Sequence, residues 1–117
     1  MFIKITGRIP SKKNSKIMVC RGRFPMLLPS KTYSIWHKDA SSQLSNIKEI
    51  KTFNKIILKI FAPDNRKSDL SNKSESLMDL LVDNKIIKDD NWFVCPDIQL
   101  LFGGVDKENP RCEISIL

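Results

Sequence analysis

The segment from residue 69 to residue 82 constrains the fold most, because its apolar residues recur at the spacing of one helix face. The residues predicted to be buried follow the i, i+4, i+7 pattern and are Leu70, Ser74, Leu77, Met78 and Leu81. Ser68 or Asp69 is expected to cap the start of this helix. The residues expected to lie opposite the buried face are Asp69, Asn72, Lys73 and Ser76. A helix with one apolar face needs a second layer to pack against.

Strand-like segments lie on both sides of this helix in the sequence. Residues 2–8 and 111–117 alternate apolar and polar side chains, and residues 54–62 are rich in β-branched residues, which is typical of a central strand. Residues 93–102 predict a further strand. The pair Gly103-Gly104 that follows it is expected to form a bulge or bend.

Two more elements are expected in the first half of the chain. Residues 17–28 predict a hairpin that turns at Arg21-Gly22-Arg23, and residues 30–44 predict a helix with Ser30 as its N-cap. The residues of this helix predicted to be buried are Tyr33, Trp36, Ala40 and Leu44. Together the elements predict one domain over residues 1–117, of the α/β (α+β) class, in which helices pack on a mixed β-sheet.

Opposite charges are concentrated in the two halves of the chain. Residues 1–59 carry thirteen Lys and Arg against two acidic residues, whereas residues 60–117 carry seven against eleven, which gives charge balances of +11 and −4. This division indicates a basic footprint for phosphate groups beside an acidic pocket for cations. The candidates for binding phosphates are Arg8, Lys12, Lys13, Asn14, Lys16, Arg21 and Arg23. The alternative is a solvated basic loop followed by a hairpin tip that is basic without a function.

Acidic residues gather in the predicted second helix and in the turns around it. These are seven of the thirteen acidic residues of the chain: Asp64, Asp69, Glu75, Asp79, Asp83, Asp89 and Asp90. A carboxylate cluster in an otherwise basic protein suggests a protein that brings a polyanion to a metal ion. Carboxylate oxygens suit Mg²⁺, which neutralises charge on a phosphate and lowers the pKa of a bound water.

The sequence lacks the usual signals of membrane or exported proteins. No apolar run approaches the roughly 20 residues of a membrane helix, and residues 1–10 lack the apolar middle of a signal peptide. The three cysteines are widely spaced and odd in number, which fits a reducing cytoplasm. We therefore expect a cytoplasmic protein without a membrane partner. The single histidine, His37, has no recognisable Ser or Cys partner, so it is expected to be an incidental surface residue, and a hydrolase of the Ser-His or Cys-His type has little support.

Four motifs, which lie in order over nearly the whole chain, resemble the RusA family of Holliday junction resolvases, often encoded by phages and prophages. They are Gly7-Arg8-Ile9-Pro10-Ser11-Lys12-Lys13-Asn14, then Ser30-Lys31-Thr32-Tyr33 with Trp36, then Asp69-Leu70-Ser71-Asn72, and finally Asp89-Asp90. The resemblance implies a RusA-like domain with endonuclease activity in DNA recombination and repair. Such an enzyme would cut four-way DNA junctions symmetrically as a homodimer, using Mg²⁺.

Family chemistry rests on three aspartates and a lysine, and the resemblance carries two of these four onto matching residues. The first and third aspartates fall on Asp69 and Asp90, whereas the second falls on Ser71 and the lysine on Glu75. Because positions 71 and 75 are neighbours on a helix, Glu75 could replace the missing carboxylate. Lys73 could supply the catalytic cation.

The resulting hypothesis is a cage of Asp69, Glu75 and Asp90 around Mg²⁺ or Mn²⁺, with Asp89 in support. In the alternative for Glu75, this residue is an ordinary exposed acid. The whole chain could also be a catalytically impaired protein of the same fold that binds branched DNA without cutting it. A third alternative is a basic RNA-binding module in which Tyr33, Trp36 and Trp92 stack on bases.

Overall fold

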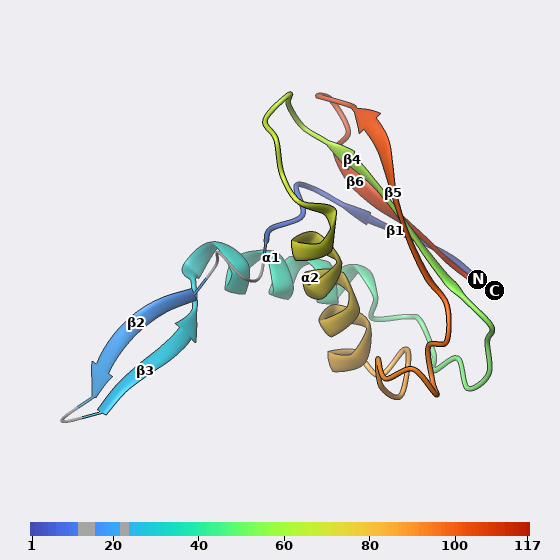
Figure 1. Ribbon diagram of the computed structural model, residues 1–117, viewed down its shortest axis with the longest axis horizontal. Helices are drawn as coiled ribbons and strands as arrows, with labels where there is room; N and C mark the ends of the chain where they lie inside the picture. The colour runs from blue at the N-terminus through green and yellow to red at the C-terminus, as the bar shows by residue number, and fades with distance from the viewer. Residues whose placement is uncertain (12–15, 22–23) are drawn as a thin grey trace.

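Four strands form a mixed sheet in which both ends of the chain meet. The computed structural model describes residues 1–11, 16–21 and 24–117, with only the backbone described for 16–21 and 24–29. The strands are β1 (Phe2–Thr6), β4 (Ile56–Ala62), β5 (Ile98–Val105) and β6 (Arg111–Ile116), in the order β1-β6-β4-β5 (Figure 1). β6 pairs antiparallel with β1 and β4, while β5 runs parallel to β4. The predicted central strand is confirmed, because β4 has a neighbour on each side.

Two helices lie on the same side of this sheet, α1 (Lys31–Gln43) and α2 (Leu70–Asp83) (Figure 1). Successive side chains of a strand point to opposite faces of the sheet, so every second side chain faces the helices. In β6 these are Cys112, Ile114 and Ile116, which are buried, while the residues between them are partly exposed. The helices complete this core with Tyr33, Trp36, Ala40, Leu77, Met78, Leu80 and Leu81. The predicted fold class is therefore confirmed as α+β. No helix in the described part of the chain is long and apolar enough to cross a membrane.

The start of α1 and its buried face agree with the prediction. The Ser30 side chain accepts a hydrogen bond from the backbone N–H of Tyr33 at 3.1 Å, which satisfies a donor that the first helical turn leaves free. Tyr33 and Trp36 are buried in the core. Neither ring is therefore available to stack on RNA bases, and Trp92, which is 78% exposed, is the only member of that set at the surface.

The prediction for α2 was wrong at Ser76, which was expected to face away from the core. Ser76 is fully buried, and its hydroxyl donates to the carbonyl oxygen of Pro10 at 2.7 Å. The helix therefore buries two faces, one against the sheet and one against the loop that follows β1. This loop lies 66 residues earlier in the chain, so helical periodicity alone could not reveal it.

Strand β5 begins at Ile98, five residues later than predicted. The side-chain oxygen of Asn91 accepts hydrogen bonds from the backbone N–H groups of Phe93 and Val94, at 3.0 and 3.1 Å. Such local bonds compete with strand pairing and hold the backbone in a turn. Apolar residues after Trp92 therefore belong to a loop, in which Phe93 is 88% exposed.

The predicted bulge at Gly103-Gly104 is confirmed. Pairing between β4 and β5 shifts register there, because Ile60 pairs with Phe102 and the next residue, Phe61, pairs with Gly104. Gly104 has a φ of 119°, which glycine adopts without strain. Gly103 is needed for a different reason: a Cβ at this position would lie 2.6 Å from the Phe61 ring.

We expect Gly103→Ala to lower the free energy of unfolding by about 1–3 kcal/mol, the usual cost of overpacking. The Phe61 ring cannot yield easily, because the Arg111 guanidinium lies 3.8 Å from its centroid. Denaturant unfolding would measure the change. The control is Leu101→Ala on the exposed part of the same strand, with an expected effect of about 0.5 kcal/mol. Equal stability of wild type and Gly103→Ala would contradict the prediction.

The predicted hairpin is confirmed and forms a second, two-stranded sheet. β2 (Lys16–Arg21) pairs antiparallel with β3 (Phe24–Pro29), from Lys16 opposite Pro29 to Arg21 opposite Phe24. Figure 1 shows this hairpin extending away from the sheet and from α2. The tip, residues 22–23, lies outside the described residues. An arm of this kind can contact a ligand that is much larger than the body of the domain.

Candidate nucleic-acid interface

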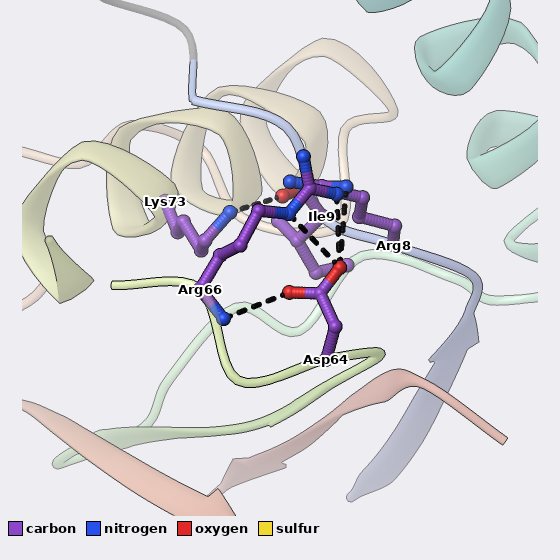
Figure 2. A network of polar contacts seen from close by, with 5 residues as sticks. All are labelled: Arg8, Ile9, Asp64, Arg66 and Lys73. Carbon is purple, nitrogen blue, oxygen red and sulfur yellow. Dashed lines mark hydrogen bonds and ion pairs between the residues drawn. The ribbon is translucent and has the colours of Figure 1, made fainter. Parts of the chain in front are cut away.

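Cationic side chains from three segments meet near the start of α2 (Figure 2). Arg8 follows β1, Arg66 lies in the loop between β4 and α2, and Lys73 lies in the first turns of α2. Asp64 ties the two arginines together: Arg66 Nη2 lies 2.9 Å and Arg8 Nη1 3.8 Å from its Oδ2 atom. One carboxylate thus faces three cations, and the cluster keeps a surplus of positive charge.

Asp64 orders the loop around itself through Arg66. The Arg66 backbone N–H donates to Asp64 Oδ1 at 3.0 Å, and the Arg66 guanidinium donates to Oδ2 through Nε and Nη2. The Arg66 side-chain hydrogen bonds are the main reason that the pKa of Asp64 falls from 3.8 to about 2. The carboxylate therefore stays ionised, and Arg66 stays oriented, far below neutral pH.

We expect the Asp64 carboxyl carbon to titrate in NMR spectra with a midpoint near pH 2. Since its folded-state pKa is depressed, the contribution of Asp64 to stability is complete above pH 3.8 and disappears as the pH falls through about 2. The control variant Arg66→Gln removes the donor guanidinium and should return the midpoint toward 3.8. A midpoint that stays the same in this variant would rule out Arg66 as the cause.

Lys73 is held in place by the loop after β1. Its ammonium donates to the carbonyl oxygen of Ile9 at 2.6 Å, beside the bond from Ser76 to Pro10 (Figure 2 shows the first of these). Partial burial lowers the pKa of Lys73, and the nearby charge of Arg8 lowers it further. Two adjacent hydrogen bonds therefore fix this loop to α2 and keep Arg8 next to Lys73.

Clefts open on both sides of this cluster. One cleft, of about 450 Å³, lies between the loop 64–68 and β5 and combines apolar walls such as Phe102 with Arg66 and Lys67. A second cleft, of about 440 Å³, lies between the starts of the two helices and includes Arg8 and Lys73. Their sizes are those of ordinary ligand pockets. Positive charge at both clefts makes anions the fitting ligands.

The residues predicted to form a metal cage are not brought together within the described chain. Asp69 is the N-cap of α2, and Asp89 and Asp90 follow the far end of this 14-residue helix, which is ~21 Å long at 1.5 Å per residue. Glu75 is exposed and lies six residues after Asp69, or ~9 Å along the axis. Among the described residues, no group of three His, Cys, Asp or Glu could hold a metal ion. Within the described chain these carboxylates therefore do not fit a single Mg²⁺.

The turn that contains Asp89 and Asp90 is closed by its own polar side chains. Asp89 accepts hydrogen bonds from the backbone N–H of Asp90 at 2.8 Å and from the Asn91 amide at 2.7 Å. The first of these bonds is the main reason that the pKa of Asp89 is lowered. Asp89 therefore shapes the turn, which presents an exposed Asp90 beside the exposed rings of Trp92 and Phe93.

The predicted phosphate-binding residues divide into three groups. Arg8 belongs to the cation cluster around Asp64. Lys16 and Arg21 are the first and last residues of β2, for which only the backbone is described. The candidates that lie outside the described residues are Lys12, Lys13, Asn14 and Arg23. Arg66 was missed in the sequence, although an Asp and an Arg two residues apart after Pro63 are a local signal for a closed turn.

His37 is not an incidental surface residue. Its Nε2 atom lies 2.9 Å from Asp83 Oδ2, and its Nδ1 atom lies 3.5 Å from the hydroxyl of Ser41. The Asn84 amide donates to the same hydroxyl at 3.1 Å. These contacts link α1 to the last turn of α2. The interhelix partner was not visible in the sequence, because Asp83 and Asn84 lie more than 40 residues away.

Comparisons with known proteins identify no relative of this chain. No protein-family model matches the chain, and no curated protein matches its sequence. The site therefore has to be interpreted from its chemistry. It combines surplus positive charge with two clefts, which favours anionic groups as ligands.

Proposed function

We propose that the chain binds and cuts four-way DNA junctions as a homodimer, in the manner of the RusA resolvases that it resembles. The observation that carries this proposal is the cluster of Arg8, Arg66 and Lys73 at the start of α2, next to Asp69. Cations of this kind bind backbone phosphates without reading sequence. Asp69 is the first aspartate of the family motif, so the cluster would bring DNA phosphates to a candidate catalytic carboxylate.

The N-terminal part of the chain supports a large polyanionic ligand. The first 38 residues contain nine Lys and Arg, and the first acidic residue is Asp39. They build β1, the projecting hairpin and the start of α1. Positive charge thus extends from the cluster into an arm, which suits the branches of a DNA junction better than a small ligand. Binding of this kind weakens steeply with salt.

A two-fold dimer supplies what one protomer lacks. Asp69 and Asp90 lie near opposite ends of α2, so an antiparallel arrangement of two protomers can place Asp69 of each beside Asp90 of the other. Two identical sites would then face the two opposed strands of a junction. We therefore propose that each site is shared between protomers. A divalent ion, Mg²⁺ or Mn²⁺, would supply charge neutralisation and an activated water when bound there.

The second candidate is a protein that binds junctions without cutting them. It is favoured by Ser71 and Glu75, which stand where the family has an aspartate and a lysine and are both exposed on α2. In this case the cation cluster would still select branched DNA. Both candidates predict the same binding and differ only in cleavage.

The test is an assay of binding and cleavage with the purified full chain in Mg²⁺. A labelled synthetic four-way junction is compared with linear duplexes built from the same strands. We expect the junction to bind at least about tenfold more tightly and to receive paired nicks on opposed strands, since each dimer would carry two sites. Binding without nicks would support the second candidate. Equal affinity for junction and duplex would contradict both.

A further inference from the structure

Most of the residues that line the cleft between the two helix starts carry a side-chain group that can donate a hydrogen bond. Its residues are Arg8, Pro10, Ser11, Thr32, Trp36, Ser68 and Lys73. Two of them are cations, three carry hydroxyls and one carries an indole N–H, and none of these described lining residues carries a carboxylate. The cleft therefore differs from its neighbour beside β5, whose lining includes the carboxylate of Asp64.

Two polar atoms of this cleft lack a partner. Trp36 Nε1 and Ser11 Oγ are buried and have no hydrogen-bond partner in the part of the chain that the structure describes. Trp36 itself is only 8% exposed. An unpaired buried donor costs free energy, and such groups in native proteins are nearly always satisfied by protein, water or a ligand. Both residues line the cleft, so a ligand bound there could supply the missing partner.

The missing partner has to be an acceptor. An indole nitrogen carries a hydrogen and can only donate, whereas a hydroxyl can turn its hydrogen toward an acceptor. Lys73 has three ammonium hydrogens, of which one is directed to Ile9 O, so it can donate again. All of these groups fit an oxygen atom that carries negative charge.

Charge points to an anion instead of a water molecule. Arg8 and Lys73 lie at the same cleft, and partial burial together with the charge of Arg8 lowers the pKa of Lys73. A neutral water would leave the repulsion between these two positive charges uncompensated. An anion between them would offset both charges and raise the pKa of Lys73 again.

The helix starts add to this preference. Thr32 lies in the first turn of α1, and Ser68 directly precedes the N-cap of α2. Residues from both helix starts thus line one cleft, and the N-terminus of a helix favours anions through its free N–H groups and its dipole. Asp69 does not cap α2 with its side chain, so donors of that first turn remain for another acceptor.

We propose that this cleft binds a phosphate group, with Trp36 Nε1 and Ser11 Oγ donating to its oxygens and with Arg8 and Lys73 neutralising its charge. Phosphate fits because it offers several oxygens in a tetrahedral arrangement to donors that come from different directions. The assignment to phosphate follows from the cleft alone. The further statement that the group belongs to a DNA backbone rests on the proposed function.

The indole N–H of Trp36 is a direct probe of this site in ¹H–¹⁵N NMR spectra. The chain contains two tryptophans, and Trp92, exposed in a distant loop, is an internal control. Inorganic phosphate is titrated into the full chain at constant ionic strength, with chloride as the reference anion, and Trp36→Phe assigns the signal. We expect a saturable shift of the Trp36 signal and none of the Trp92 signal. An unmoved Trp36 signal, or an equal response to chloride, would overturn the proposal.

Variants of the donors test the same site without disturbing the core. Ser11→Ala removes one orphaned donor from a loop. Thr32→Val removes a hydroxyl and keeps a side chain of nearly the same shape. We expect Ser11→Ala to weaken phosphate binding about tenfold, the effect of losing one charge-assisted hydrogen bond. The matched control is Ser45→Ala, an exposed serine just after α1, which should bind phosphate as the wild type does. Unchanged binding in both Ser11→Ala and Thr32→Val would count against the site.

A deoxydinucleotide separates the two possible sources of the phosphate. If it shifts the Trp36 signal as inorganic phosphate does, a DNA backbone phosphate is supported. If only inorganic phosphate does so, the phosphate site stands and a DNA phosphate is excluded as its occupant. Neither titration uses junction DNA, so a protein that fails to select junctions would overturn the proposed function while these shifts remain.

Discussion

A heterodimer of the Asp69→Asn and Asp90→Asn variants is expected to nick a four-way junction, although neither variant does so alone. Each substitution removes a carboxylate from both shared sites of its own homodimer, so each should lose cleavage by about 100-fold or more, as expected when a catalytic group is removed. In the heterodimer, one site carries both substitutions and the other carries neither. One intact site should therefore remain.

The heterodimer should nick one strand of the junction and leave the opposed strand whole. Two different affinity tags on coexpressed chains allow it to be isolated, and denaturing gels of the labelled strands report the nicks. The matched reference is a heterodimer of wild type with Asp69→Asn, which keeps one intact site whether sites are shared or not. Equal nicking by the two heterodimers would support sharing. A heterodimer of the two variants without activity would show that both aspartates act within one protomer.

Local pattern predicted most of the secondary structure, because apolar residues recur at one period in helices and at another in strands, and this period is visible within a single element. Ser30 caps α1 as expected, and β4 is central as its β-branched run indicated. Partners distant in sequence caused the misses. Ser76 is buried by a loop 66 residues earlier, and the Asn91 side chain holds a turn where apolar residues suggested a strand.

The candidate site was predictable in its residue types but not in its arrangement. Charge patterning indicated a phosphate-binding protein, and Arg8 does lie in a cation cluster. Spacing in sequence could not show that α2 keeps Asp69 and Asp90 apart. The loop after a helix can either fold back toward the start of the helix or continue away from it. The two orphaned donors were also invisible in the sequence, because a tryptophan at helical spacing looks like a core residue. Trp36 is both a core residue and, in our proposal, a ligand of phosphate.

Lys73→Met is expected to weaken junction binding about 10- to 100-fold, since it removes a charge-assisted contact made by a fixed side chain. Lys73 is positioned before DNA arrives, because its ammonium is bound to Ile9 O and α2 restricts its backbone. It therefore loses little side-chain freedom on binding a phosphate, unlike an exposed lysine. Binding would also raise the lowered pKa of Lys73, which adds to its preference for an anion.

The control is Lys67→Met, which removes the same charge from an exposed residue at the rim of the cleft beside β5. Fluorescence anisotropy with labelled junction at several salt concentrations separates the two variants. Both should reduce the slope of log K against log salt by about 0.9 if each lysine neutralises one phosphate. Only Lys73→Met should add the larger loss of affinity, and thermal unfolding would show whether the Ile9 loop stays folded. Equal losses in both variants would mean that charge alone matters, and that the fixed position of Lys73 contributes nothing to binding.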